Sequence, residues 1–109
     1  MRVLIVAGCV PPETIRTELP GVVTVSESSY SGAVDAVQRG GLGAVIVPDE
    51  IEARVTGSAL DVVRVCRGRS VPCLLISDTW EAGAYGAAVA PYRGAIVAVV
   101  EFVRRRLSQ

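Results

Sequence analysis

Short runs of β-branched and aliphatic residues alternate along the chain with segments of helical character, and this alternation limits the possible folds more than any other feature. The apolar runs are typical of strands buried on both faces, and they span residues 2–7, 22–25, 42–47, 71–77 and 87–90. Helices are expected at 12–19, 33–39, 58–67 and 92–107, with a helical turn at 51–55. The pattern predicts an α/β domain whose parallel sheet is covered by helices on both faces.

Length and charge indicate the scale of the domain and the class of its partners. The chain has 109 residues, 50% of them apolar, so we expect one domain, 1–109, with a single core. Eleven arginines offset 11 acidic residues, which argues against nucleic acid or a membrane surface as a partner. No apolar run approaches the roughly 18 residues of a membrane span, and three cysteines without CxxC spacing favour reduced thiols in a cytoplasmic protein.

Local signals bear on the ends and faces of the helices. Pro12 and Glu13 suit the first turn of the 12–19 helix, and Ser31 is expected to cap the next one. The inner face of the 58–67 helix is expected to carry Leu60 and Val63. The closing helix has a broad apolar stripe, which indicates deep burial or a partner surface. It is formed by Ile96, Val97, Val99, Val100, Phe102, Val103 and Leu107.

The loops that follow parallel strands are where ligands bind in such a sheet, here 7–12, 48–52, 77–83 and 90–93. At these loops the chain resembles the receiver domain of two-component response regulators. The resemblance is carried by RVLIV, SESSYSGAVDAVQRGGLGAVIVPD, ALDVVRVCR, VPCLLIS and AGAYGAAVAPY, the last with Pro91 and Tyr92 in the family's proline and aromatic places. It implies a single three-layer α/β/α domain with a five-stranded, flavodoxin-like parallel sheet. Because few residues separate Asp78 from Gly86, the fourth helix of that fold is expected to be shortened or missing.

The resemblance also assigns places to the residues of the receiver phosphorylation site. A receiver carries an acidic pair after the first strand, an aspartate after the third, a hydroxyl after the fourth and a lysine after the fifth. Here Ala7 and Gly8 stand in the acidic places and Ala90 stands in the lysine place. Ser77 alone keeps the expected hydroxyl.

Two neighbouring residues compete for the phosphoacceptor place. A gapless comparison puts Pro48 there, and Asp49 takes the place only after a slip of one residue, which reverses the face of a strand residue. Two or three carboxylates are needed to hold the magnesium ion that compensates the charge of a transferring phosphoryl group, and the chain contains no lysine. We therefore predict a vestigial phosphoacceptor region that has no catalytic residue, no metal and no cofactor.

Aromatic residues indicate binding instead of catalysis. Trp80, Tyr85 and Tyr92 fall in or beside the segment that lacks a helix, and Phe102 belongs to the closing helix. Such residues are enriched in protein interfaces. With the last strand, they predict an interaction surface for a protein partner or a homodimer. The predicted function is a phosphorylation-independent, receiver-like signalling or interaction module.

Two other functions stay open. The segment VIVPDEIEARV (45–55) resembles the small F subunit of the V-type ATP synthase central stalk, which implies a structural stalk subunit. Cys9 follows the first strand, where low-molecular-weight tyrosine phosphatases and some sugar-phosphotransferase subunits keep their nucleophile. Against a Cys9-dependent phosphatase or phosphotransferase, Arg16 lies seven residues on instead of six, and Pro11 and Pro12 remove amide donors from the loop.

Overall fold

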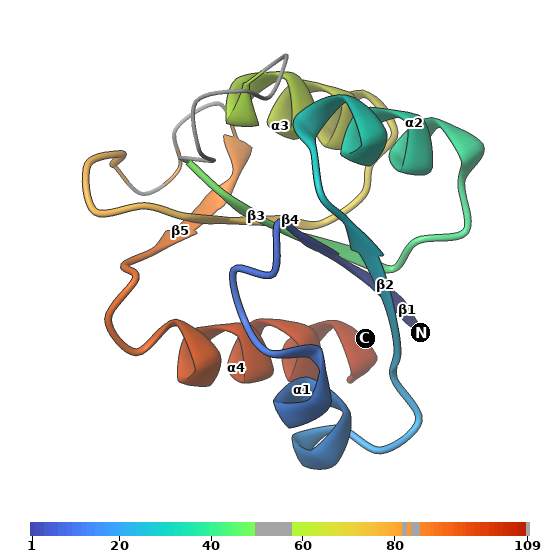
Figure 1. Ribbon diagram of the computed structural model, residues 1–109, viewed down its shortest axis with the longest axis vertical. Coiled ribbons are helices and arrows are strands. Elements are labelled where there is room, and N and C mark those ends of the chain that lie inside the picture. The colour runs from blue at the N-terminus through green and yellow to red at the C-terminus, as the bar shows by residue number, and fades with distance from the viewer. Residues whose placement is uncertain (50–57, 82, 84–85, 109) are drawn as a thin grey trace.

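The computed structural model describes residues 1–49, 58–81, 83 and 86–108. Its strands form one parallel sheet in the order β2-β1-β3-β4-β5, crossing the middle of the molecule (Figure 1). The strands are Arg2–Val6 (β1), Val23–Glu27 (β2), Ala44–Pro48 (β3), Cys73–Ile76 (β4) and Ala88–Ala90 (β5). This arrangement confirms the predicted five-stranded α/β fold.

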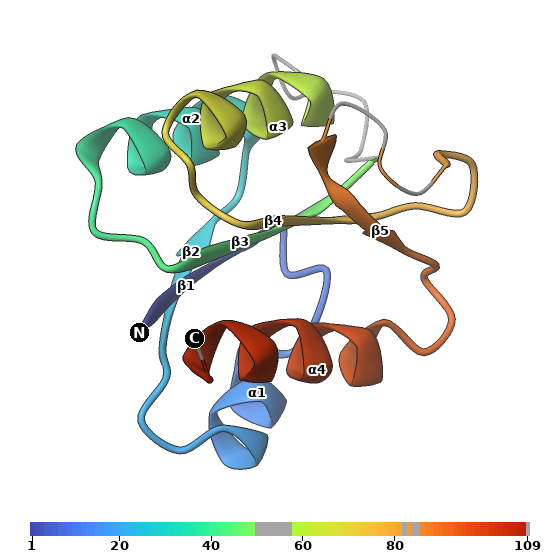
Figure 2. The ribbon, with the colours of Figure 1, turned by 180° about the vertical axis from the view of Figure 1, so that it is seen from behind.

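Helices cover both faces of the sheet and make the outer two layers. The helices α1 (Pro12–Glu18) and α4 (Ala95–Leu107) pack side by side on one face, while α2 (Tyr30–Arg39) and α3 (Ala59–Gly68) pair on the other (Figures 1 and 2). The molecule measures 33 × 30 × 24 Å. Within the described part of the chain, none of the helices combines the length and apolarity that a membrane span requires.

Alternate strand residues supply the two halves of the core. Val3 and Ile5 of β1 belong to the cluster under α1 and α4, whereas Leu4 and Val6 belong to the cluster under α2 and α3. This two-residue alternation is the normal geometry of a strand between two helical layers. Strand β3 is the middle strand of the sheet and is buried over its whole length. Asp49, which follows it, therefore lies at the centre of the sheet edge.

The described residues of the connection between β4 and β5, 77–81, 83, 86 and 87, contain no α-helix, and only Gly86 among them has 3-10 helical geometry. Four helices accompany the five strands, which confirms the prediction that the fourth helix of the flavodoxin-like arrangement is missing or shortened. The predicted helical turn at 51–55 lies outside the described residues, as do Glu50 and Glu52.

Two predictions about the α2 and α3 helices were wrong. Helix α2 begins at Tyr30, because its N-cap is Ser29, whose side chain accepts a hydrogen bond from the Gly32 N–H at 3.0 Å; Ser31 is not the cap. Helix α3 begins at Ala59, after a capping box between Ser58 and Asp61. The buried residues of α3 recur at helical spacing and are Ala59, Val62, Val63 and Cys66. Leu60, which was predicted to lie on the inner face, falls beside it and is only half-buried.

The apolar stripe of α4 is only partly buried. Val99, Val100 and Val103 lie in the core, as predicted. Ile96 and Leu107, which were predicted to lie with them, are 38% and 46% exposed. One helix cannot bury apolar residues over so wide an arc against a single neighbouring layer. The excess remains on the outer surface of α4.

Candidate functional site

The loops after β1, β3, β4 and β5 meet at the carboxyl edge of the sheet. Asp49 follows β3, Ser77 follows β4 and Tyr92 follows β5. Parallel neighbours bring the ends of these strands together although the residues are far apart in the sequence. This edge is the candidate functional site.

The carboxylate of Asp49 is the centre of a cluster of hydroxyl groups. Its Oδ2 atom accepts a hydrogen bond from the Ser77 hydroxyl at 2.6 Å, and its Oδ1 atom accepts one from the Tyr92 hydroxyl at 2.5 Å. The Thr79 hydroxyl makes a longer contact, 3.4 Å, with Oδ2. Hydrogen bonds from neutral hydroxyls to a carboxylate are short and strong because the acceptor is charged. Both oxygens of this carboxylate are therefore already engaged.

Ser77 organises the loop that follows β4. It is only 4% exposed, and its Oγ accepts hydrogen bonds from the backbone N–H groups of Thr79 at 3.1 Å and Trp80 at 3.0 Å. Its own N–H donates to the Ala90 carbonyl at 2.9 Å, which extends the pairing of β4 with β5. Ser77 thus connects the turn, the last strand and Asp49.

The register between β3 and β4 identifies which residue faces Ser77. Pro48 pairs with Ile76, and the Asp49 N–H donates to the Ile76 carbonyl at 2.9 Å, so the pairing continues one residue past the proline. Pro48 is buried, and its carbonyl accepts a hydrogen bond from the Tyr30 hydroxyl at 2.8 Å. The gapless comparison named Pro48, but it is the side chain of Asp49 that reaches Ser77, while Pro48 is buried in the strand.

Tyr92, in the loop between β5 and α4, bonds to both Asp49 and Asp78. It is 40% exposed, its hydroxyl donates to Asp49, and its N–H donates to Asp78 Oδ1 at 3.1 Å. Ala90, in the lysine place, is 6% exposed and adds only a methyl group to this edge. The arrangement fixes the β5–α4 loop against the end of β3.

The loop after β1 supplies no carboxylate to this edge. Ala7 and Gly8 have φ values of 57° and 60°, in the left-handed region that a residue with a Cβ adopts at some cost. In the described part of the chain, no group of three or more Cys, Asp, Glu or His side chains is arranged to hold a metal ion. Among the described residues, the hydroxyl donors of this edge converge on the carboxylate of Asp49, and a second carboxylate, Asp78, accepts from the Tyr92 N–H.

Cys9 lacks the surroundings of a nucleophilic thiolate. Burial raises the pKa of its thiol from 9.0 to about 11, although nearby backbone N–H groups partly offset this effect. The thiol lies 3.9 Å from the Ile46 carbonyl. Arg16, which a phosphatase loop would aim at phosphate, instead donates to Thr24 Oγ1 at 2.6 Å and pairs with Glu13 at 3.7 Å.

Cys66 and Cys73 are free and buried against one another, at the end of α3 and the start of β4. Their mutual hydrogen bond raises the pKa of Cys73, burial raises it further, and the same bond lowers the pKa of Cys66. This contact is the normal behaviour of two small thiols that share a core.

The three described aromatic residues of the predicted interaction surface, Trp80, Tyr92 and Phe102, lie in different parts of the molecule. Trp80 is half-buried against the α2/α3 side of the core, whereas Phe102 is half-buried against the α1/α4 side. Tyr92 lies at the carboxyl edge, and Tyr85 lies outside the described residues. Of the three described aromatic residues, Tyr92 is the one whose side chain bonds to Asp49, while Trp80 reaches the site through its backbone N–H.

Apolar residues of α4 that the sequence assigned to the inner stripe form a different exposed patch. Ile96 and Val97 are 38% and 65% exposed, and they follow closely after Tyr92. With Glu18 of α1 and Glu101 and Arg104 of α4, they line a shallow cavity of about 290 Å³ that also includes Val100. In the sequence, the breadth of the apolar stripe on this helix was the feature that indicated an exposed apolar surface. We call Tyr92, Ile96 and Val97 the α4 patch.

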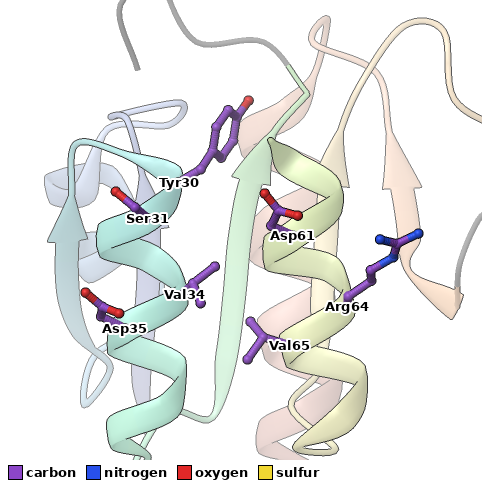
Figure 3. Close-up of a pocket in the computed structure, with 7 residues that line it drawn as sticks. All are labelled: Tyr30, Ser31, Val34, Asp35, Asp61, Arg64 and Val65. Carbon is purple, nitrogen blue, oxygen red and sulfur yellow. The ribbon is translucent and has the colours of Figure 1, made fainter. Parts of the chain in front are cut away.

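A second concave surface lies between α2 and α3. It is an open groove of about 640 Å³, in which Val34 and Val65 point toward one another while Arg64 points away (Figure 3). Tyr30 stands at one end of the groove, beside the end of β3 (Figure 3). Through its bond to the Pro48 carbonyl, Tyr30 connects the start of α2 to the residue before Asp49.

Comparison with solved structures places the fold among receiver domains. The chain is similar to the Francisella response regulator 1452 receiver domain, with a TM-score of 0.66 at 12% identity over 95% of this chain and 97% of that one. It is also similar to a CheY-like response regulator receiver domain protein from Methanospirillum hungatei JF-1, with a TM-score of 0.64 at 15% identity over 99% and 98%. No protein family and no curated protein matches the sequence. The class that the fold defines is a receiver-like α/β domain.

Proposed function

We propose that the chain is a non-catalytic, phosphorylation-independent signalling module with a receiver-like fold, which acts by binding a protein partner or a second copy. The single observation that carries this proposal is the state of Asp49. Both of its carboxylate oxygens accept hydrogen bonds from Ser77 and Tyr92, while Ala7 and Ala90 occupy the places where a receiver has charged residues.

The chemistry of phosphoryl transfer explains why this state argues against a phosphate switch. Magnesium needs several oxygen ligands at fixed positions, and a lone carboxylate holds it weakly. A carboxylate that attacks phosphorus must also release the hydrogen bonds on the attacking oxygen. The chain contains no lysine whose ammonium group could stabilise a bound phosphoryl group.

The α4 patch supports the binding part of the proposal. Val97 is 65% exposed and lines the same cavity as Ile96, and exposed apolar side chains that adjoin one another are typical of interaction sites. Glu101 and Arg104 flank this patch with charges of opposite sign, as the rim of an interface often does. The binding surface that we propose consists of the end of β5, the β5–α4 loop and the outer face of α4.

Charge and thiol content agree with a protein partner in the cytoplasm. The formal net charge is zero, which gives no general attraction to nucleic acid or anionic lipid. Cys9, Cys66 and Cys73 are free thiols, as is usual in a reducing compartment. The stalk-subunit alternative rests on residues 45–55, most of which lie outside the described residues, so that alternative stays a prediction.

Site-specific photocrosslinking tests the proposed surface. A photoreactive amino acid replaces Val97 in the cells that produce the chain, and the matched control replaces Val23, which is 56% exposed on the edge strand β2. We expect a discrete crosslinked product from position 97, to a second copy or to one partner, and none from position 23. The same products with Asp49→Asn would show that binding needs no phosphoryl group. Equal crosslinking at both positions, or none at either, would contradict the proposed surface.

A further inference from the structure

A small cavity lies at the amino edge of the sheet, at the opposite end of the strands from Asp49. It has a volume of about 130 Å³ and lies between the start of β4 at Cys73 and the start of β5 at Ala88. Arg67, near the end of α3, and Arg106, near the end of α4, both line it. Two helices that belong to opposite faces of the sheet thus each contribute an arginine to the lining of one small space.

One contact holds the Arg106 guanidinium in place, but one of its buried nitrogen atoms lacks a hydrogen-bond acceptor among the described residues. Its guanidinium carbon lies 4.9 Å from the centroid of the Phe102 ring, a cation–π contact that sets the plane of the group. Its Nε atom is buried and has no hydrogen-bond partner among the described residues. A buried N–H of a charged group without an acceptor is costly, so an acceptor in the adjoining cavity would stabilise the protein.

Arg67 is placed beside the cavity by Gly86. A Cβ atom at Gly86 would lie 3.6 Å from Arg67 Cδ and 3.8 Å from its Nε, so the arginine stem passes directly over the glycine. The ion pairs seen in the described residues join Arg16 to Glu13 and Arg39 to Glu27. Neither cavity arginine is therefore neutralised by a described carboxylate.

The remaining described lining of the cavity is apolar or uncharged. Val63, Val71 and Pro72 form part of its wall, and no acidic residue is among the described residues that line it. Positive charge beside apolar walls interacts more strongly with an anion because water screens it less, an effect that applies to the half-buried Arg106 more than to the exposed Arg67. Arginine forks match phosphate oxygens in geometry and carry a charge at every physiological pH.

We propose that this cavity binds a single phosphate group, either inorganic phosphate or the phosphate of a monoester, between Arg67 and Arg106. Two unpaired guanidinium groups match the charge of a phosphate dianion better than that of a carboxylate. The space accommodates one tetrahedral anion or a few waters. The site is independent of Asp49 and of the α4 patch, so it does not rest on the proposed function.

Calorimetric titration of the whole chain with inorganic phosphate at constant ionic strength tests this site. Arg67→Gln and Arg106→Gln each remove one guanidinium, whereas Arg64→Gln and Arg105→Gln remove the same charge from nearby positions that do not line the cavity. We expect each cavity variant to weaken phosphate binding by about tenfold, which is about 1.4 kcal/mol, and each control to change it by less than about twofold. Circular dichroism verifies that all four variants are folded.

Parallel titrations with phenyl phosphate and acetate distinguish the source of the anion. Tighter binding of phenyl phosphate would identify a phosphomonoester site, and tighter binding of inorganic phosphate would identify a site for the free ion. Acetate is expected to bind more weakly than either. The proposal is overturned if the wild-type chain shows no saturable phosphate binding at millimolar concentration, if acetate binds as tightly, or if the control variants lose as much affinity as the cavity variants.

Discussion

Replacing Ser77 by alanine removes the hydroxyl on which the Asp49 cluster depends. The Ser77 side chain donates one hydrogen bond, of 2.6 Å, to the Asp49 carboxylate, and accepts two from the N–H groups of Thr79 and Trp80. A hydrogen bond to a charged group contributes about 1.5–3 kcal/mol, and a buried N–H left without a partner adds to the loss. Because Asp49 and the turn are partly solvated, we expect the free energy of unfolding to fall by about 2–3 kcal/mol.

Urea denaturation measures this loss directly. The chain has one tryptophan, Trp80, whose N–H bonds to Ser77, so its fluorescence reports on the loop while far-ultraviolet circular dichroism reports on the whole fold. Coincident transitions justify a two-state free energy. The melting temperature is expected to fall by about 10 °C, the size expected for such a loss in a domain of about 100 residues.

Two further variants make the result specific to the hydroxyl. Ser77→Thr keeps the donor and is expected to cost less than Ser77→Ala, about 1 kcal/mol, which is the lower end of the usual cost of adding a methyl group at a buried position. Ser28→Ala changes an exposed serine and is expected to stay within about 0.5 kcal/mol of the wild type. If Ser77→Ala also stays within about 0.5 kcal/mol, the hydroxyl does not organise the site and the reasoning above is refuted.

Three other predictions concern the same edge of the sheet. In a double-mutant cycle of Tyr92→Phe with Asp49→Asn, urea denaturation should give a coupling energy of about 0.5–1 kcal/mol, since the hydrogen bond between the two side chains is short but partly exposed. If the two substitutions have additive effects on the free energy of unfolding, this hydrogen bond contributes nothing to stability. Burial raises the pKa of Cys9, so the thiol ionises only in the unfolded chain between pH 9.0 and about 11, and the free energy of unfolding should fall over that range. Cys9→Ala should remove this part of the pH dependence; if the variant keeps the wild-type pH profile, the raised pKa of Cys9 is not its cause. Ala7→Gly should raise the melting temperature slightly, by relieving up to about 1 kcal/mol of left-handed strain, and a lower melting temperature would contradict that cost.

The fold could be predicted from the sequence because it depends on local patterns. Continuous apolar runs such as Val3–Val6 identify buried strands, and the few residues between Asp78 and Gly86 already excluded a full helix. The errors concerned small shifts within a pattern. Ser29 and Ser31 are both acceptable caps, and only the backbone path that reaches Gly32 selects Ser29.

The candidate site was predictable only in part, because its geometry depends on contacts between distant residues. Asp49 and Tyr92 are 43 positions apart, and nothing local to either residue indicates their hydrogen bond. The choice between Pro48 and Asp49 depends on the register with β4, fixed by the bond to the Ile76 carbonyl. Sequence patterns identify which strand ends meet at an edge, but the direction of each side chain there depends on the pairing.

The convergence of Arg67 and Arg106 had no signal in the sequence. Each residue stands in the last turn of its helix, where a basic side chain usually compensates the helix dipole. Their shared cavity arises because β4 and β5 are neighbours, so the ends of α3 and α4 come together at the amino edge. Tertiary structure alone brings these two charges to one space.

The claim that the receiver-like fold works here without phosphorylation is tested most directly by intact-mass spectrometry. The chain is incubated with acetyl phosphate and Mg²⁺, beside a phosphorylatable receiver domain that verifies the reagent. We predict that the mass of this chain stays unchanged while the control gains one phosphoryl group. A phosphoryl adduct on the wild-type chain that is absent from Asp49→Asn would contradict the account.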